Sequence, residues 1–161
     1  MHQIEITYTR NLRTQCNHLQ SGNKITTDAP VENHGSGEAF SPTDLAATAL
    51  GSCLLTIMGI AAKTHGIIIN DSIARVTKIM SKNPRRIGKI IVDIDIPYEL
   101  STKEKRLLNQ AAKGCPVHHS LHPLPLPTQI PKTLLLQDRH NLWLEHYHLF
   151  QIQICKTVWQ P

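Results

Sequence analysis

Aromatic residues are scarce in this sequence of 161 residues, which has three tyrosines, two phenylalanines and two tryptophans. Proteins that bind single-stranded nucleic acid stack the bases on aromatic side chains that lie in a basic groove. A strong charge of one sign is also lacking, because the net charge of +5 is a mild excess and the lysines and arginines are scattered along the chain. The composition therefore argues against a nucleic-acid partner.

The usual signs of a secretory leader are absent too, since no basic segment followed by an apolar run opens the sequence. We therefore expect a cytoplasmic protein. The cysteines contain no CxxC pair and are widely spaced, at Cys16, Cys53, Cys115 and Cys155. In a reducing compartment, such cysteines are more often redox-active or inert than joined in structural disulfides.

Long apolar segments are absent with one exception, the 18 uncharged residues from 45 to 62. This length just reaches the threshold for a helix that spans a membrane. Ten of the eighteen residues are Ala, Gly, Ser or Thr, which are too weakly apolar for comfortable insertion. We therefore interpret the segment as a buried core helix and expect no membrane partner.

The spacing of the apolar residues predicts an α+β domain. Residues 3–9 alternate as a half-buried strand does, and they open a predicted meander of three strands. A polar loop over residues 28–40 then leads to a long central helix, a β-hairpin and a pair of helices. The predicted elements cover residues 3–9, 12–20, 24–27, 41–64, 72–80, 87–97 and 101–114, with a short helix from residue 115.

The predicted helices carry explicit end signals. Ser41 can cap the long helix, Pro42 fits its first helical position, and Asp44 completes a capping box. Gly66 suits the left-handed conformation that ends many helices. A second capping box, Ser-Thr-Lys-Glu over residues 101–104, predicts the start of the next helix.

The C-terminal part differs in character from the rest. Four prolines crowd residues 123–131 and favour an extended segment, and a final strand near residues 130–136 is a candidate. We predict one domain over residues 1–137 and an appendage of unknown order over residues 138–161. A lineage-specific extension and a shifted reading frame both account for this appendage.

Two of the cysteines lie at places where thiol chemistry is plausible. Cys53 is in the middle of the long helix, where a free cysteine is most often buried and inert. Cys115 starts a helix, where backbone amides stabilise a thiolate. If the two helices pack together, one thiolate could attack a peroxide bond and the other thiol could capture the sulfenic acid. Spacing alone leaves the inert and the redox-active interpretations open.

The segments SPTDLAATALGSC and GCPVHHSLHP, preceded by TDAP and NHGSGEAF, resemble the OsmC-like family of osmotically inducible and organic hydroperoxide resistance proteins. The resemblance covers roughly residues 1–123. It implies a thiol-dependent peroxidase that acts on organic hydroperoxides, small or derived from fatty acids, without a bound cofactor. It also implies an intertwined homodimer with two sites at its interface, and reduction by dithiols, lipoyl groups among them. Cys53 would be the peroxidatic cysteine and Cys115 the resolving one.

The resemblance further implies a cation that stabilises the thiolate, because a thiol in an apolar helix has a raised pKa. The family uses an arginine from the N-terminal strands, held by a carboxylate. Arg13 fits this arginine, with Arg10 as its rival and an ordinary exposed strand arginine as the alternative. Thr43 replaces the glutamate of the hydroperoxide resistance branch. We therefore predict that Glu38 holds the arginine, with Asp44 as the second choice.

The long helix also offers candidates for the wall of a peroxide pocket. Leu50, Leu54 and Met58 share a helix face with Cys53, although plain core packing is the competing interpretation.

Histidines near Cys115 raise the alternative of a zinc site. His118, His119 and His122 follow Cys115 closely, and His and Cys are zinc ligands. A structural zinc site normally takes a second ligand pair from elsewhere in the chain, and none is obvious beyond His34 or His65, so we expect no metal.

A second function class stays open beside the peroxidase. The fold could serve a non-enzymatic dimeric protein that binds a small hydrophobic ligand or a partner, and the loss of the family glutamate at Thr43 favours this slightly.

Overall fold

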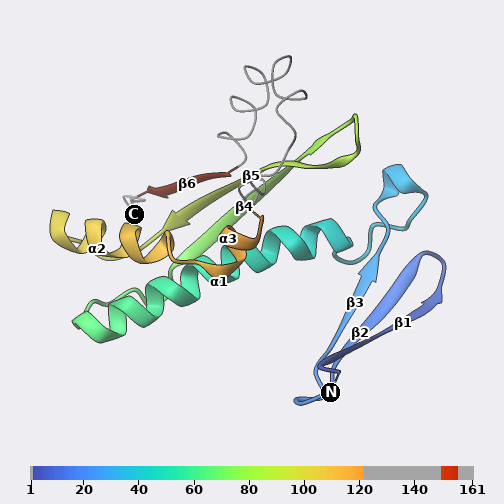
Figure 1. Cartoon of the computed structure of the whole chain (residues 1–161), viewed down its shortest axis with the longest axis horizontal. Coiled ribbons are helices and arrows are strands. Elements are labelled where there is room, and N and C mark those ends of the chain that lie inside the picture. The colour runs from blue at the N-terminus through green and yellow to red at the C-terminus, as the bar shows by residue number, and fades with distance from the viewer. Residues whose placement is uncertain (1, 122–149, 156–161) are drawn as a thin grey trace, which may run out of the picture. The chain divides into compact units, whose positions relative to one another are not determined.

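The computed structural model describes residues 2–121 and 150–155 of the chain (Figure 1). Runs of strands and runs of helices follow one another in it, as in an α+β fold, which confirms the predicted fold class. In chain order the elements are β1 (Ile4–Arg10), β2 (Arg13–His18), β3 (Lys24–Asp28), the 3-10 helix η1 (Val31–Asn33), α1 (Pro42–His65), β4 (Ile73–Ser81), β5 (Arg86–Asp95), α2 (Thr102–Ala112), α3 (Pro116–Leu121) and β6 (Phe150–Cys155).

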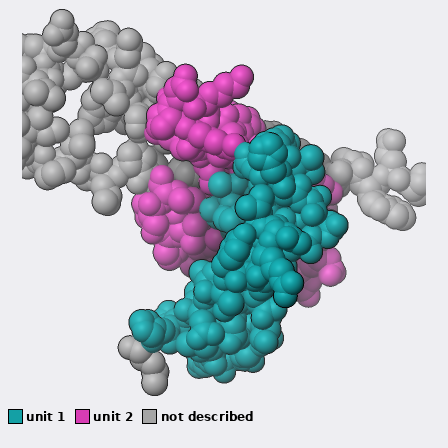
Figure 2. Space-filling view, turned by 90° about the vertical axis from the view of Figure 1, so that its right-hand side faces the viewer, with its two compact units in different colours: residues 1–46 teal, residues 47–161 magenta. Residues whose placement is uncertain are grey.

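The chain divides into two compact units, residues 1–46 and residues 47–161 (Figure 2). The first unit holds the N-terminal sheet and the loop that follows it. The second unit holds most of α1, the second sheet and the two shorter helices.

The sheet of the first unit is an antiparallel meander in the order β1-β2-β3, as the sequence predicts. β1 and β2 are joined by the two-residue turn Asn11-Leu12, with Arg10 paired to Arg13 across it. Both turn residues have positive φ angles, of 52° and 61°, as a tight hairpin turn requires. This turn makes Arg13 the first residue of β2.

The burial of β1 differs from the prediction. The alternation of residues 3–9 predicts a half-buried strand, yet every residue of β1 is exposed. The reason is that a period of two requires only that one face be apolar, and it does not identify what covers that face.

The predicted capping box at the start of α1 is present. The Asp44 carboxylate accepts hydrogen bonds from the Ser41 backbone N–H at 2.9 Å and from the Ser41 hydroxyl at 2.6 Å. In return, the Asp44 backbone N–H donates to the Ser41 hydroxyl oxygen at 3.2 Å. The helix ends at His65, and Gly66 follows with a φ of 67°, as the sequence predicts.

One face of α1 packs into the core of the second unit, alongside the β4–β5 hairpin (Figure 1). The buried helix residues recur at three- and four-residue intervals. They are Ala47, Leu50, Gly51, Leu54, Met58 and Ala62. By length and composition α1 could also cross a membrane, a test that the core helix of a soluble protein passes equally. Its packing on the sheet is that of a core helix.

The second sheet has the order β4-β5-β6 and mixes two kinds of pairing. β4 and β5 form the predicted antiparallel hairpin, and alternate residues of β5, Ile90, Val92 and Ile94, are buried. β6 pairs in parallel with β5. A parallel neighbour needs a crossover connection, and α2 and α3 both lie within that connection.

Strand β6 falls within residues 138–161, the predicted appendage, where the sequence pattern indicates no strand. The candidate strand over residues 130–136 lies outside the described residues. The domain boundary at residue 137 stays a prediction.

Two glycines of α1 provide a matched test of this packing. A Cβ on Gly51 would lie 2.7 Å from Cγ2 of Val76 on β4, whereas a Cβ on Gly59 would meet no described atom within 4 Å. We expect Gly51→Ala to destabilise the protein by about 1–3 kcal/mol through overpacking. Gly59→Ala should instead stabilise it by about 0.5–1 kcal/mol, because alanine is the better helix former. Urea unfolding at one protein concentration measures both, and equal effects would contradict the close packing of α1 on β4.

Candidate redox site

The second unit brings two cysteines together that lie 62 positions apart in the chain. The thiol of Cys115 donates a hydrogen bond to the sulfur of Cys53, with the two Sγ atoms 2.6 Å apart. Both are free cysteines, Cys53 partly buried and Cys115 fully buried. The predicted meeting of the two thiols is therefore present in the structure, whereas their catalytic roles stay predictions.

Helix packing explains why these cysteines meet. Cys53 lies on α1 directly before Leu54, a residue of its buried face. The buried residues Leu108 and Ala112 of α2 join the same core cluster, and Cys115 belongs to it as well. When α2 buries its apolar stripe on this core, the chain that follows it delivers Cys115 to the side of α1.

Local hydrogen bonds hold Cys115 at the start of α3. Its carbonyl oxygen accepts from the His119 backbone N–H at 3.1 Å, and its sulfur accepts from the His118 backbone N–H at 3.4 Å. Pro116 occupies the first helical position, as the sequence predicts. Cys115 thus caps the helix with its side chain.

Burial decides the protonation of Cys115. It raises the pKa of the Cys115 thiol above its ordinary value, and the hydrogen bond with Cys53 raises it further. The backbone N–H of His118 opposes this rise. The sequence predicts a thiolate stabilised by helix amides at Cys115, but burial prevails over the amides. Cys115 therefore keeps its proton at neutral pH and is the donor, and Cys53 is the acceptor.

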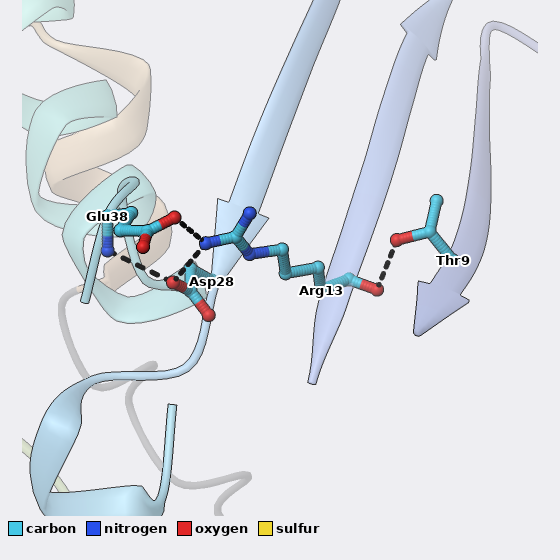
Figure 3. Close-up of polar contacts among 4 residues, drawn as sticks. All are labelled: Thr9, Arg13, Asp28 and Glu38. Carbon is cyan, nitrogen blue, oxygen red and sulfur yellow. Dashed lines mark hydrogen bonds and ion pairs between the residues drawn. The ribbon is translucent and has the colours of Figure 1, made fainter. Parts of the chain in front are cut away.

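The first unit holds a separate cluster of charges around Arg13 (Figure 3). Arg13 lies opposite Asp28 in the register of β2 and β3. Its Nη2 atom donates to an Asp28 carboxylate oxygen at 3.2 Å and to a Glu38 carboxylate oxygen. The structure thus brings Arg13 to Glu38, the predicted carboxylate, and adds Asp28, which the sequence analysis missed.

The charges of this cluster stabilise one another. Glu38 and then Asp28 raise the pKa of the Arg13 guanidinium. The backbone N–H of Glu38 is the main cause that lowers the pKa of Asp28, and Arg13 lowers it further. Burial of the Asp28 carboxylate acts in the opposite direction without prevailing. Arg13 and Asp28 are therefore both charged at neutral pH.

A signal for Asp28 does exist in the sequence. The predicted meander joins residues 12–20 to residues 24–27 by a short turn, and continuing this register by one residue sets Asp28 opposite Arg13. Opposite charges in directly paired positions stabilise a sheet.

The second-choice residues have other surroundings. The Asp44 carboxylate caps α1, and Arg10 forms no ion pair within the described residues. Thr43, at the position of the family glutamate, has its hydroxyl 3.0 Å from that of Ser41.

The predicted pocket wall is wrong. Leu50, Leu54 and Met58 are each 0% exposed and belong to the core cluster, so they have no surface to offer a substrate. The reason is that the face of α1 that these three residues share is the one packed onto the sheet.

No group of three or more His, Cys, Asp or Glu residues suited to a metal occurs within residues 2–121 and 150–155. His122, a member of the predicted alternative, lies outside the described residues, so the absence of metal stays a prediction.

The model of the family described as OsmC-like protein matches residues 35–128. This chain belongs to the OsmC-like family. A solved protein from Psychrobacter arcticus 273-4, described as an osmotic stress induced and detoxification response protein, is 38% identical. The match covers 98% of this OsmC-like chain and 96% of the Psychrobacter chain, with a TM-score of 0.77.

More distant solved structures share the fold of this OsmC-like chain. An OsmC-like protein from Mycoplasma pneumoniae is 19% identical, with 96% and 94% of the two chains covered and a TM-score of 0.67. An organic hydroperoxide resistance protein, OsmC, from Legionella pneumophila is 16% identical, with 96% and 95% covered and a TM-score of 0.60. A search of curated proteins found no match.

Acid should weaken the Arg13 cluster. Because the folded-state pKa of Asp28 lies below its ordinary value of 3.8, the unfolded chain binds the proton more readily. The stability from this carboxylate is therefore complete above the unfolded pKa and is lost as the pH falls through the folded pKa. We expect the difference in unfolding free energy between the wild type and Asp28→Asn to be constant near pH 7 and to shrink below pH 3.8. Urea unfolding between pH 7 and pH 2 measures it, and a constant difference throughout would contradict the assignment.

Proposed function

We propose that this OsmC-like protein is a thiol-dependent peroxidase that reduces organic hydroperoxides. The observation that carries the proposal is the contact between the Cys53 and Cys115 sulfurs at 2.6 Å, in which Cys115 donates and Cys53 accepts. Two free thiols in contact can cycle between dithiol and disulfide without a large movement of the chain. The Legionella relative of the same fold is named an organic hydroperoxide resistance protein.

The proposed reaction assigns one step to each cysteine. The Cys53 thiolate attacks the hydroperoxide, so that an S–O bond forms and the O–O bond breaks, and the alkoxide that leaves takes a proton from water to become the alcohol. The Cys115 sulfur then attacks the Cys53 sulfenic acid, and a disulfide and water form. A dithiol, with lipoyl groups as candidates, reduces this disulfide by thiol exchange. Cys115 suits the second role because its raised pKa keeps it protonated while Cys53 reacts.

Arg13 is proposed to stabilise the Cys53 thiolate and the charge on the leaving oxygen. This part of the proposal rests on family membership and on the chemistry of the Arg13 cluster. Both carboxylates contact the same guanidinium nitrogen, Nη2, and the buried Nε has no hydrogen-bond partner within the described residues. A guanidinium held at one nitrogen in this way keeps other N–H donors available for an anion.

The intertwined homodimer is part of the same proposal. Register sets apolar residues on one face of the N-terminal sheet, and Ile4, Ile6, Tyr8 and Ile25 are 50–64% exposed in the single chain. A large contiguous apolar surface is typical of an interface. A second copy that covers this face would account for a β1 strand whose alternation predicts burial. The cytoplasmic location stays a prediction.

The non-enzymatic alternative has lost its supporting observation. The missing glutamate at Thr43 favours it in the sequence, but Glu38 and Asp28 provide carboxylates to Arg13 in the structure. Absence of turnover in the activity test would restore it.

Serine variants of three cysteines test the assignment. Cys53→Ser should abolish consumption of an organic hydroperoxide with a dithiol as reductant, by a factor of about a thousand or more, because no thiolate remains to attack. Cys115→Ser should permit one oxidation and then stall, with Cys53 over-oxidised to sulfinic acid under excess peroxide. Cys16→Ser is the matched control, since Cys16 is a free cysteine of β2 outside the pair, and it should keep wild-type turnover.

Coupled peroxide assays and mass spectrometry of the Cys53 peptide measure these outcomes. Turnover by Cys53→Ser at the wild-type rate would show that Cys53 is not the nucleophile. Absence of over-oxidation in Cys115→Ser would show that Cys115 does not resolve the sulfenic acid.

A pH–rate profile tests Arg13. Arg13→Ala should raise the pKa of Cys53 by about 1–3 units, because an opposite charge that favours the thiolate is removed. The rate lost at pH 7 should then return in part at pH 9. Arg13→Lys should recover little, since a point charge does not replace a planar fork. Arg10→Ala is the control, and a shifted profile for Arg10→Ala with an unchanged one for Arg13→Ala would transfer the role to Arg10.

A further inference from the structure

Asp28 is the charged residue that the described part of the chain buries completely, with 0% of its surface exposed. Burying a carboxylate is unfavourable unless it is paired and hydrogen-bonded. The burial of Asp28 therefore requires a structural or a functional explanation. Its two partners, Arg13 and Glu38, are both in the predicted catalytic set.

A single oxygen of Asp28 serves both partners (Figure 3). Oδ2 accepts from Nη2 of Arg13 at 3.2 Å and from the backbone N–H of Glu38 at 3.0 Å. The Glu38 side chain then turns to the same Nη2 atom. Asp28 thus holds the guanidinium and the backbone of the residue that pairs with it, and the three residues close into a triangle.

The loop between β3 and α1 is also tied down at Asp28. The Asp28 backbone N–H donates to the Phe40 carbonyl at 3.1 Å, and the next residue, Ala29, donates to the carbonyl of Leu12 at 3.2 Å. A Cβ on Gly35 would lie 1.7 Å from the Ala29 carbonyl oxygen, so the loop folds tightly onto this point. Asp28 therefore lies where the start of β2, the end of β3 and the returning loop meet.

Exposure separates the two carboxylates by role. The Glu38 side chain is 67% exposed and the Arg13 side chain 31% exposed, so water competes for the pair that they form. Asp28 has no exposed surface and no freedom to move away. The buried Asp28 is thus the fixed partner of Arg13. The exposed Glu38 is held in position by the hydrogen bond from its backbone N–H to Asp28.

We propose that Asp28 is a positioning residue, whose buried carboxylate holds the Arg13 guanidinium and the Glu38 backbone in the geometry that serves the Cys53 thiolate. This inference rests on the proposed function of Arg13 and adds a residue to it. Asp28 acts through Arg13 and does not touch the substrate.

Alkylation of Cys53 reads this role without requiring turnover. The rate constant for iodoacetamide at Cys53, followed by mass spectrometry of its peptide, is measured from pH 5 to pH 10. Asp28→Asn should react about 3- to 10-fold more slowly than the wild type at pH 7, because a displaced guanidinium stabilises the thiolate less. The difference should vanish at high pH. Asp71→Asn removes the charge of an exposed aspartate elsewhere and should react like the wild type.

Whether Asp28→Asn slows or speeds alkylation of Cys53 distinguishes a positioning role from a purely electrostatic effect of the Asp28 charge. Removing a negative charge favours a nearby thiolate, so a role by charge alone would speed alkylation of Asp28→Asn at pH 7. A merely structural role would lower stability and leave the pH profile in place. Faster or unchanged alkylation would each overturn the proposal.

A double-mutant cycle tests whether Asp28 acts through Arg13. In an Arg13→Ala background, Asp28→Asn should slow alkylation no further, since the group that it positions is gone. Independent, multiplicative slowing would overturn the proposal. If Arg13→Ala itself leaves alkylation unchanged, the proposed role of Arg13 fails and this inference falls with it. If Arg13→Ala slows the reaction and Asp28→Asn does not, this inference alone fails.

Hydrogen exchange of the wild-type protein keeps the proposal testable if Asp28→Asn does not fold. The Glu38 amide, bonded to the buried carboxylate, should exchange at least about tenfold more slowly than the amide of Glu32, an exposed residue of the same loop. Equal exchange of the two amides would show that Asp28 does not hold the loop.

Discussion

The packing of α1 against the β4–β5 hairpin is the constraint on which the redox site depends. Because Gly51 has no side chain, Val76 of β4 approaches the helix backbone closely, and a Cβ on residue 51 would lie 2.7 Å from Cγ2 of Val76. This close approach packs the helix onto the sheet. The buried face then runs past Cys53, which is only partly covered. Because α2 buries its own stripe in the same core, Cys115 arrives beside Cys53. The thiol pair is thus a consequence of how the core is filled.

The thiol pair lies in the apolar core of the second unit, whereas the first unit contains the cluster of charged residues around Arg13. The second unit keeps Cys115 in the core, where burial raises its thiol pKa and makes it a hydrogen-bond donor. The first unit holds a cluster of charges in which Asp28 and Glu38 share a nitrogen of Arg13. A buried thiol needs no counter-charge, whereas a buried carboxylate does. This difference explains why the buried Asp28 carboxylate is paired with the Arg13 guanidinium.

The chain also departs at Thr43 from the pattern that its resemblance to the family implies. Where the hydroperoxide resistance branch has a glutamate in the first turn of the long helix, this chain has Thr43, whose hydroxyl lies close to the helix cap. The carboxylates that reach the arginine come instead from the end of β3 and from the loop before the helix. A charge can be supplied from a different point of the backbone as long as its carboxylate reaches the same guanidinium.

Local signals were enough to predict the helices α1, α2 and α3 and the strands β1 to β5 from the sequence, although not β6. The Ser41 and Ser101 capping boxes are both present, and the alternation of β5 is matched by its burial. These patterns depend on residues a few positions apart, so the chain carries them before it folds. The family motifs likewise marked Cys53 and Cys115 as partners, whereas Glu38 was predicted as a substitute for the family glutamate that Thr43 replaces.

Contacts between distant residues were decided only by the tertiary structure. Periodicity placed Leu50, Leu54 and Met58 on a face with Cys53, but the sheet packed against that face made them core. It marked β1 as alternating, yet nothing in the part of the chain that the structure describes buries its apolar face. Asp28 looked like a loop residue until strand register set it opposite Arg13. Burial and pairing depend on which surfaces meet, and a sequence read along its length states only which surfaces exist.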